Sequence, residues 1–192
     1  MELFTIFISA VLVNNFVLAR FLGICPFLGQ SRNVKMALGM GGAVIFVMTL
    51  ASVATNFIYG FVLVPLKMQY LATVSFILVI AALVQLVDIV LQKVLPALHR
   101  TMGIYLVLIT TNCAILGIAL LNVVKNYGII ESLVFGFSAG IGFTLALFIM
   151  AGIRERLELA DVPKPLRGFP ITLILAGILS IAFMGFAGLV KL

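Results

Sequence analysis

The chain has 192 residues, of which 64% are hydrophobic and 9% are charged. Because soluble proteins average about 25% charged residues, this composition predicts an integral membrane protein and excludes an ordinary soluble enzyme. The net charge of +6 does not indicate a nucleic-acid partner, because the basic residues lie in short loops between apolar runs, where they set the orientation in the membrane.

Six apolar runs follow one another along the chain, each about 20 residues long and so able to cross a bilayer core of about 30 Å as a helix. They cover residues 3–25, 36–59, 70–92, 102–124, 128–151 and 170–190. Six spans leave no room for a soluble domain. The sequence therefore predicts an all-α membrane protein that forms a single transmembrane domain over residues 1–192.

The distribution of basic residues predicts the orientation of these spans. The loops after the first, third and fifth spans hold Arg20, Arg32, Lys35, Lys93, Arg100, Arg154, Arg156, Lys164 and Arg167, whereas the other side holds Lys67, Lys125 and Lys191. This excess places both termini on the non-cytoplasmic side. The longest cytoplasmic loop, residues 154–168, is interpreted as a solvated linker or as a docking surface.

An internal repeat relates the two halves of the chain, about 1–95 and about 96–192. At an offset of 97 residues the matched pairs are Asn15 with Asn112, Gly39 with Gly136, and Phe46 with Phe143. Each half then contains three spans. Since three is odd, the second half crosses the membrane in the opposite sense, so the sequence predicts two inverted three-helix repeats with a functional site near the midplane.

Two stretches place polar residues inside the first span of each repeat. They are LVNNFVLARFLGICPF (residues 12–27) and LITTNCAILG (residues 108–117). Asn and Thr side chains can bind backbone groups that are freed where a helix unwinds. We therefore expect the first helix of each repeat to be broken at mid-membrane. The residues expected to face the interior are Asn14, Asn15, Thr110, Thr111 and Asn112; ordinary hydrogen bonds between intact helices are the alternative.

The two cysteines, Cys25 and Cys113, leave several alternatives open. A buried cysteine is often a small inert hydrophobic residue, and the sequence neither supports nor excludes a disulfide. No His accompanies them and neither lies in a C-x-x-C pair, so one chain lacks the four thiolates of an ordinary iron–sulfur cluster. Two thiolates from this chain and two from a related chain would complete such a site at their interface.

Other polar residues are weaker candidates for function. Asp88 and Gln85 lie on one side of the third span, where the carboxylate is either an ion site or a snorkelling group near the surface. Arg20 is expected either to lie near an anionic cluster or to contact lipid phosphate. His99 is a lone loop residue. Small residues in spans two and five indicate close helix packing, and they are Gly39, Gly41, Gly42, Ser138, Gly140 and Gly142.

Five longer motifs resemble the A-subunit family of the Rnf electron transport complexes, nearly end to end. They read LVNNFVLARFLGICPFLG, FVMTLAS, LITTNCAILGIALLN, IRERLELADVP and AFMGFAGLVKL. The chain is similar, less closely, to the E subunit of the Na+-translocating NADH:quinone reductase. The resemblance implies a multi-pass subunit of the bacterial inner membrane, paired with a homologous Rnf E subunit of opposite topology.

The same resemblance implies the site residues. Cys25 and Cys113 match the family's cluster cysteines, which implies a [2Fe-2S] cluster shared with the partner chain, while Asn15 and Asn112 are expected to support the helix breaks. In an unbroken helix Cys25 would lie about 15 Å beyond Asn15. Breaks at residues 14–15 and 23–26 are therefore expected to return its thiol toward the midplane.

The resemblance further implies a role in a complex that couples electron flow between ferredoxin and NAD+ to Na+ or H+ transport. The B, C, D and G subunits would carry flavin and other iron–sulfur centres. We find no nucleotide-binding loop, flavin motif or catalytic triad, so this chain is expected to have no catalytic residues of its own. The alternatives are a small inverted-repeat secondary transporter, or a scaffold subunit without a cofactor.

Overall fold

The computed structural model describes residues 2–31, 33–65, 67, 69–94, 108–109 and 111–185, and every regular element within these residues is a helix. The elements are α1 (Glu2–Ile8), η1 (Ser9–Val13), α2 (Ile24–Gln30), α3 (Val34–Ile58), η2 (Tyr59–Leu63), η3 (Gln69–Leu71), α4 (Ala72–Val94), α7 (Cys113–Val124), α8 (Ile129–Glu158), η4 (Lys164–Leu166) and α9 (Phe169–Met184). The predicted all-α architecture is confirmed.

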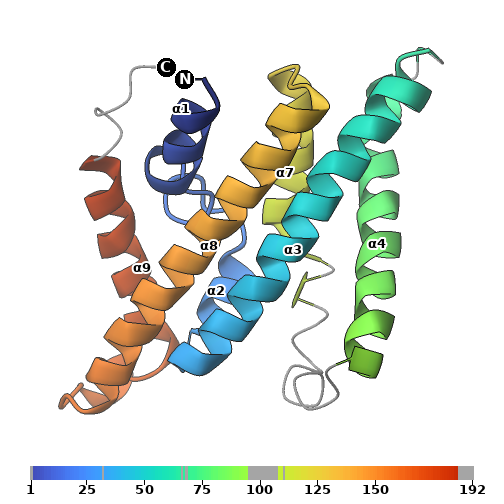
Figure 1. Ribbon diagram of the computed structural model, residues 1–192. Helices are drawn as coiled ribbons and strands as arrows, with labels where there is room; N and C mark the ends of the chain where they lie inside the picture. The colour runs from blue at the N-terminus through green and yellow to red at the C-terminus, as the bar shows by residue number, and fades with distance from the viewer. Residues whose placement is uncertain are drawn as a thin grey trace.

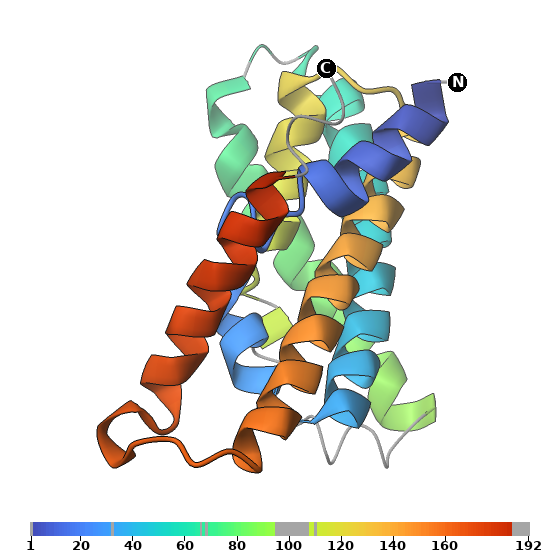
Figure 2. The ribbon, with the colours of Figure 1, turned by 90° about the vertical axis from the view of Figure 1, so that its left-hand side faces the viewer.

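Two long helices, α3 and α8, pack side by side in opposite directions at the centre of the molecule (Figures 1 and 2). Their contacts run in opposite order along the two helices, since Gly41 packs against Thr144 and Gly140 against Ile45. A Cβ atom built on Gly140 would lie 2.8 Å from the Cα atom of Ile45. Glycines thus allow the two backbones to approach closely, as is common in membrane helix pairs.

The other helices surround this pair. Figure 1 shows α4 beyond α3 on one side and α9 beyond α8 on the other, while α7 packs on α3 and α1 on α8. The largest fully buried side chains are Phe16, Phe27, Phe76, Phe143, Leu18, Met40, Met48, Ile115, Ile118, Leu147 and Met150. The core therefore lies around α3, α7 and α8, against the segment that follows η1.

The outer surface is apolar, as expected for a protein in lipid. Large side chains such as Phe61, Leu78 and Ile181 are exposed. Within the described part of the chain, three helices are long and apolar enough to cross a membrane: Val34–Leu63, Ala72–Val90 and Ile129–Glu158. Shorter apolar helices cover Leu3–Val13, Cys113–Val124 and Phe169–Met184. A helical membrane protein is confirmed, and the count of six spans stays a prediction.

The bounds of corresponding helices follow the repeat offset. Helix α9 begins at Phe169, 97 residues after α4 begins at Ala72. Helix α8 begins at Ile129, 95 residues after α3 begins at Val34. The two pairs also run in opposite directions in Figure 1. Opposite directions are what an inverted repeat predicts, and the six-span inverted repeat stays a prediction.

The first predicted span is interrupted over residues 14–23, named here the first interruption. A π-turn ends η1, where the Asn14 N–H donates to the Ser9 carbonyl oxygen over 2.7 Å, and the helix resumes only at Ile24. The expected break at residues 14–15 is therefore observed. The prediction of a second break at residues 23–26 was wrong for residues 24–26. Cys25 and Pro26 lie inside α2, because proline is tolerated in the first turn of a helix.

The far end of α2 is held by α8. The Arg154 guanidinium donates from Nη1 to the Leu28 carbonyl oxygen and to Ser31 Oγ, each over 2.9 Å. The neighbouring Glu155 carboxylate accepts from the Val34 N–H at the start of α3 over 3.0 Å. Helix α8 continues to Glu158, so the loop predicted at residues 154–168 begins only after that residue.

Candidate functional site

The first interruption is held in place by Asn15, which is fully buried. Its Nδ2 atom donates to the Gly142 carbonyl oxygen in α8 over 2.7 Å and to the Val11 carbonyl oxygen over 3.3 Å. Its Oδ1 atom accepts from the backbone N–H groups of Val17 and Leu18. One side chain thus binds four backbone groups, two of which the interruption frees.

Close packing against α8 makes the bond from Asn15 possible. A Cβ atom on Gly142 would lie 3.1 Å from the Val11 carbonyl oxygen and 3.2 Å from that of Ala10. A side chain at this position would require the η1 backbone to shift by a few tenths of an ångström. The predicted role of Gly142 in helix packing thus extends to positioning the interruption.

The second stretch is interrupted directly before α7. Residues 108–109 are helical, whereas Thr111 and Asn112 are not. Asn112 has extended backbone angles and caps α7, because its Oδ1 atom accepts from the Ala114 N–H over 3.0 Å. Its side chain is buried and its Nδ2 atom has no hydrogen-bond partner among the described residues.

The prediction that Thr110 and Thr111 face the interior is not confirmed for either residue. Thr111 is exposed, so its expected place in the interior was wrong. Thr110 lies outside the described residues.

Asn14, in the first stretch, is half-buried, and its Nδ2 atom donates to Ser9 Oγ over 3.1 Å, across the π-turn.

Gly23 brings the two interruptions together. Its N–H donates to the Sγ atom of Cys113 over 2.9 Å, and its own φ of +81° lies in the left-handed region that glycine adopts without strain. A Cβ atom here would lie 2.8 Å from the Phe143 ring, 3.1 Å from Asn112 Oδ1 and 3.2 Å from Ala114 Cβ. Only glycine fits this position.

The contact at Gly23 brings the backbone two residues before Cys25 against the sulfur atom of Cys113. Cys25 is the second residue of α2 and Cys113 the first residue of α7. Because two residues span at most about 7 Å, the backbone of Cys25 lies close to the atom that donates to Cys113 Sγ. Segments 88 residues apart in sequence thus present two thiols at the N-terminal ends of two helices.

The residues present fit half of a four-thiolate site. Both cysteines are free thiols and both are exposed on this chain, so a second protein chain can reach them. A backbone N–H donated to sulfur is the contact that stabilises a negatively charged sulfur ligand. Among the described residues no group of three or more His, Cys, Asp or Glu side chains could hold a metal ion, so a cluster site on this chain needs ligands from another.

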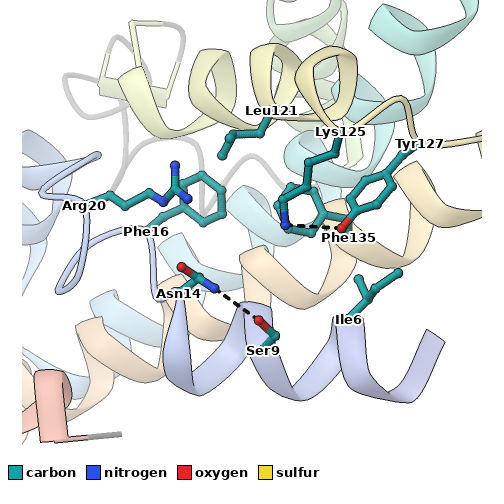
Figure 3. A pocket seen from close by; sticks show the side chains of 9 residues that line it. All are labelled: Ile6, Ser9, Asn14, Phe16, Arg20, Leu121, Lys125, Tyr127 and Phe135. Carbon is teal, nitrogen blue, oxygen red and sulfur yellow. Dashed lines mark hydrogen bonds between the residues drawn. The ribbon is translucent and has the colours of Figure 1, made fainter. Parts of the chain in front are cut away.

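A small pocket lies between the first interruption and the other end of α7 (Figure 3). Its volume of about 20 Å³ is on the order of that needed for one water molecule. The lining residues are Ile6, Ser9, Asn14, Phe16, Arg20, Leu121, Lys125, Tyr127 and Phe135. The Lys125 ammonium donates to the Tyr127 hydroxyl oxygen over 3.2 Å and lies 5.6 Å from the centre of the Phe135 ring.

This pocket corrects the assignment of Arg20. By its place in the sequence, Arg20 was counted with the loop after the first span, and Lys125 with the opposite side. The structure places both side chains at the same pocket (Figure 3). Arg20 therefore belongs to the interruption inside the span, and the count of basic residues on the predicted cytoplasmic side falls by one.

The weaker candidates lie on other helices or outside the described residues. Asp88 is half-buried and Gln85 is exposed, both on α4. His99 lies outside the described residues.

The predicted packing glycines differ in their contacts. Gly41 and Gly140 lie at the contact of α3 with α8, whereas a Cβ atom on Gly42 would meet nothing within 4 Å.

Two residues of this region were not predicted as site residues. The sequence indicates Gly23 only as part of a break, and the donation from its N–H to sulfur has no signature in the sequence. Arg154 was counted only for its charge. Nothing in the sequence around it indicates that it binds the end of α2 from within α8.

Comparisons with known proteins cover almost the whole chain. The family model described as "Rnf-Nqr subunit, membrane protein" matches residues 3–190. A relative from Syntrophotalea carbinolica, named as the A subunit of an ion-translocating oxidoreductase complex, is 59% identical over 98% of this chain and 98% of its own length. A relative of that name from Serratia proteamaculans is 58% identical over 99% of this chain and 98% of its own.

A further relative carries a more specific name. It comes from Acetobacterium woodii, is named as the A subunit of a Na(+)-translocating ferredoxin:NAD(+) oxidoreductase complex, and is 57% identical over 98% of this chain and 98% of its own length. These similarities confirm the resemblance that the sequence motifs indicated.

Proposed function

Because the chain belongs to the Rnf-Nqr subunit family of membrane proteins, we propose that it is the A subunit of an ion-translocating ferredoxin:NAD+ oxidoreductase complex. In this proposal Cys25 and Cys113 supply half of the ligands of a [2Fe-2S] cluster inside the membrane. A homologous subunit of opposite topology supplies the other two thiolates. The names of the similar proteins support the complex, and the cysteine geometry supports the site.

The observation that carries the proposal is the hydrogen bond from the Gly23 N–H to Cys113 Sγ. It joins the start of α2, which bears Cys25, to the start of α7, which bears Cys113. The N-terminus of a helix such as α7 carries a partial positive charge that favours a nearby anion, and Cys113 lies there. A cysteine that only fills space in the core would be buried, whereas both cysteines are exposed. Nor would it require a hydrogen bond between the two segments that carry the cysteines.

The chain's own residues position the two cysteines. Asn15 fixes the first interruption on α8, Gly23 allows α2 to start against α7, and Asn112 caps α7. When bound, a [2Fe-2S] cluster accepts and releases one electron at a time. The described part of this chain places no other redox-active side chain pair beside these thiols.

The inverted repeat belongs to the same proposal. The antiparallel packing of α3 on α8 and the shared offset of α4 and α9 support two inverted halves. A partner with the same fold and the opposite orientation would meet this chain about a pseudo-two-fold axis. The orientation with both termini on the non-cytoplasmic side of a bacterial inner membrane follows from the basic residues and remains part of the proposal.

The test is the iron content and EPR spectrum of the chain purified together with its membrane partner. We expect about two irons per pair and a reduced-cluster signal. Both should be lost in Cys25→Ser and in Cys113→Ser, while Thr73→Ser on the exposed face of α4 retains them. Fully assembled pairs without iron, with unchanged electron transfer in both cysteine variants, would leave a secondary transporter or a scaffold subunit instead.

A further inference from the structure

Asn112 has a hydrogen-bond donor that the described residues leave unused. The residue is only 4% exposed, and its Oδ1 atom is occupied by the Ala114 N–H. Its Nδ2 atom has no partner among the residues that the structure describes. A buried amide donor without an acceptor is costly, so we expect an acceptor that the described residues do not supply.

The carboxamide of Asn112 is fixed beside the two cysteines. The cap bond to Ala114 reaches across Cys113, and the Oδ1 atom lies 3.1 Å from the position of a Cβ atom on Gly23. The Gly23 N–H in turn lies 2.9 Å from Cys113 Sγ. The amide and the sulfur are therefore both neighbours of Gly23, two residues before Cys25.

We propose that the Asn112 Nδ2 atom donates a hydrogen bond to a sulfur atom of the shared cluster, and so raises its reduction potential. This inference rests on the proposed function. Sulfur ligands accept hydrogen bonds, and donors around a cluster help to set its potential. Reduction adds negative charge, so a donated N–H stabilises the reduced form more than the oxidised form. Asn112 is a positioning residue for α7 and, through Nδ2, a residue that tunes the electron carrier.

Two substitutions separate the donor from the cap. Asn112→Ser and Asn112→Asp both retain an oxygen that caps α7 well, but neither retains the amide donor. Asn122→Ser is the matched control, because Asn122 is also buried on α7 and lies about 15 Å further along the helix. The measurement is the midpoint potential of the cluster in the purified subunit pair, followed by EPR during redox titration.

We expect Asn112→Ser to lower the equilibrium constant for reduction about tenfold, which is about 59 mV for a one-electron couple. Asn112→Asp should lower it further, since it also adds negative charge. The control Asn122→Ser should change it less than about twofold. Unchanged potentials in both Asn112 variants, with the cluster present, would overturn the inference and leave the proposed function intact.

A second measurement needs no variant of the site. The native pair is prepared with asparagine labelled with ¹⁵N at the side-chain amide, and the reduced cluster is examined by pulsed EPR. We expect a hyperfine coupling to one amide nitrogen. A cluster signal without any such coupling would overturn the role of Asn112, whereas a pair without iron or signal would overturn the proposed function itself.

Discussion

At the scale of single residues, Gly23 has the most demanding position in the chain. Its backbone is left-handed, its missing Cβ leaves room for Phe143, and its N–H donates to Cys113 Sγ. The backbone conformation and the contact with Phe143 require glycine, and the hydrogen bond depends on where this backbone lies. The local geometry at the cysteines therefore depends on a residue that carries no side chain.

Replacing this glycine should damage the site more than the fold. In Gly23→Ala the left-handed backbone costs about 1–2 kcal/mol, and the new methyl group would overlap the Phe143 ring. We expect the pair to assemble with iron content reduced by more than half, as measured by metal analysis. Gly177→Ala, on α9 with nothing within 4 Å of its Cβ position, is the control. Equal iron in the two variants would contradict this role.

Asn15 should contribute stability because its side chain binds two backbone N–H groups of the first interruption and ties them to carbonyl oxygens of η1 and α8. Asn15→Ala leaves the Gly142 carbonyl oxygen without this donor inside the protein, and the loss of such a buried bond costs about 1–3 kcal/mol. We expect a lower thermal midpoint of the detergent-purified pair. The exposed Asn33 gives the control Asn33→Ala, and an equal midpoint for the two variants would argue against the assignment.

At the scale of the elements, the contact of α3 with α8 determines where the other helices lie. The glycines of α8 divide into those at the contact and those away from it. Gly140 faces the backbone of Ile45, whereas a Cβ atom on Gly152 meets nothing within 4 Å. The same helix thus offers a test position and a control.

Gly140→Ala should destabilise the helix pair, because an extra methyl group in a tight contact costs about 1–3 kcal/mol. Gly152→Ala should be neutral or stabilising, since alanine is favoured over glycine in a helix by about 0.5–1 kcal/mol. Thermal unfolding of both variants in the same detergent measures the difference. A greater loss of stability in Gly152→Ala would contradict the packing described here.

The sequence predicted most of the long helices and the residue at which the first span is interrupted, but not the residue at which that helix resumes. Long apolar runs gave α3, α4, α8 and α9, and paired Asn residues marked where the first span stops at Asn14. The point at which it resumes was not predictable, since it depends on the left-handed Gly23 packing against α7. Hydropathy does not distinguish Cys25 in a helix from Cys25 in a break.

At the scale of the whole molecule, Arg20 shows what the count of charges misses. The sequence places it beside a loop, whereas in the structure its side chain lines the same pocket as Lys125. The convergence of the cysteines could be expected only from the family resemblance, because it rests on a tertiary contact between segments far apart. Which surface a partner covers is likewise decided by the fold.

The predicted orientation can be tested with single cysteines in a chain that carries Cys25→Ser and Cys113→Ser. Figure 1 places the start of α4 and the end of α8 at opposite ends of the molecule. Tyr70 is 79% exposed near the first of these and Leu159 is 91% exposed at the second. A membrane-impermeant maleimide should label Tyr70→Cys in intact cells and Leu159→Cys only after lysis. The reverse pattern would contradict the assigned orientation.

Cross-linking measures directly whether the thiols of Cys25 and Cys113 in one chain lie close enough together to be joined. The chain has two cysteines, so a short bifunctional maleimide applied to the iron-free chain has no other thiols to join. We expect an intramolecular link between the two cysteine peptides, found by mass spectrometry in the monomeric chain. With Cys113→Ser and Val74→Cys on the exposed face of α4, the link should disappear. Separate adducts on Cys25 and Cys113, with no link between them, would contradict the account.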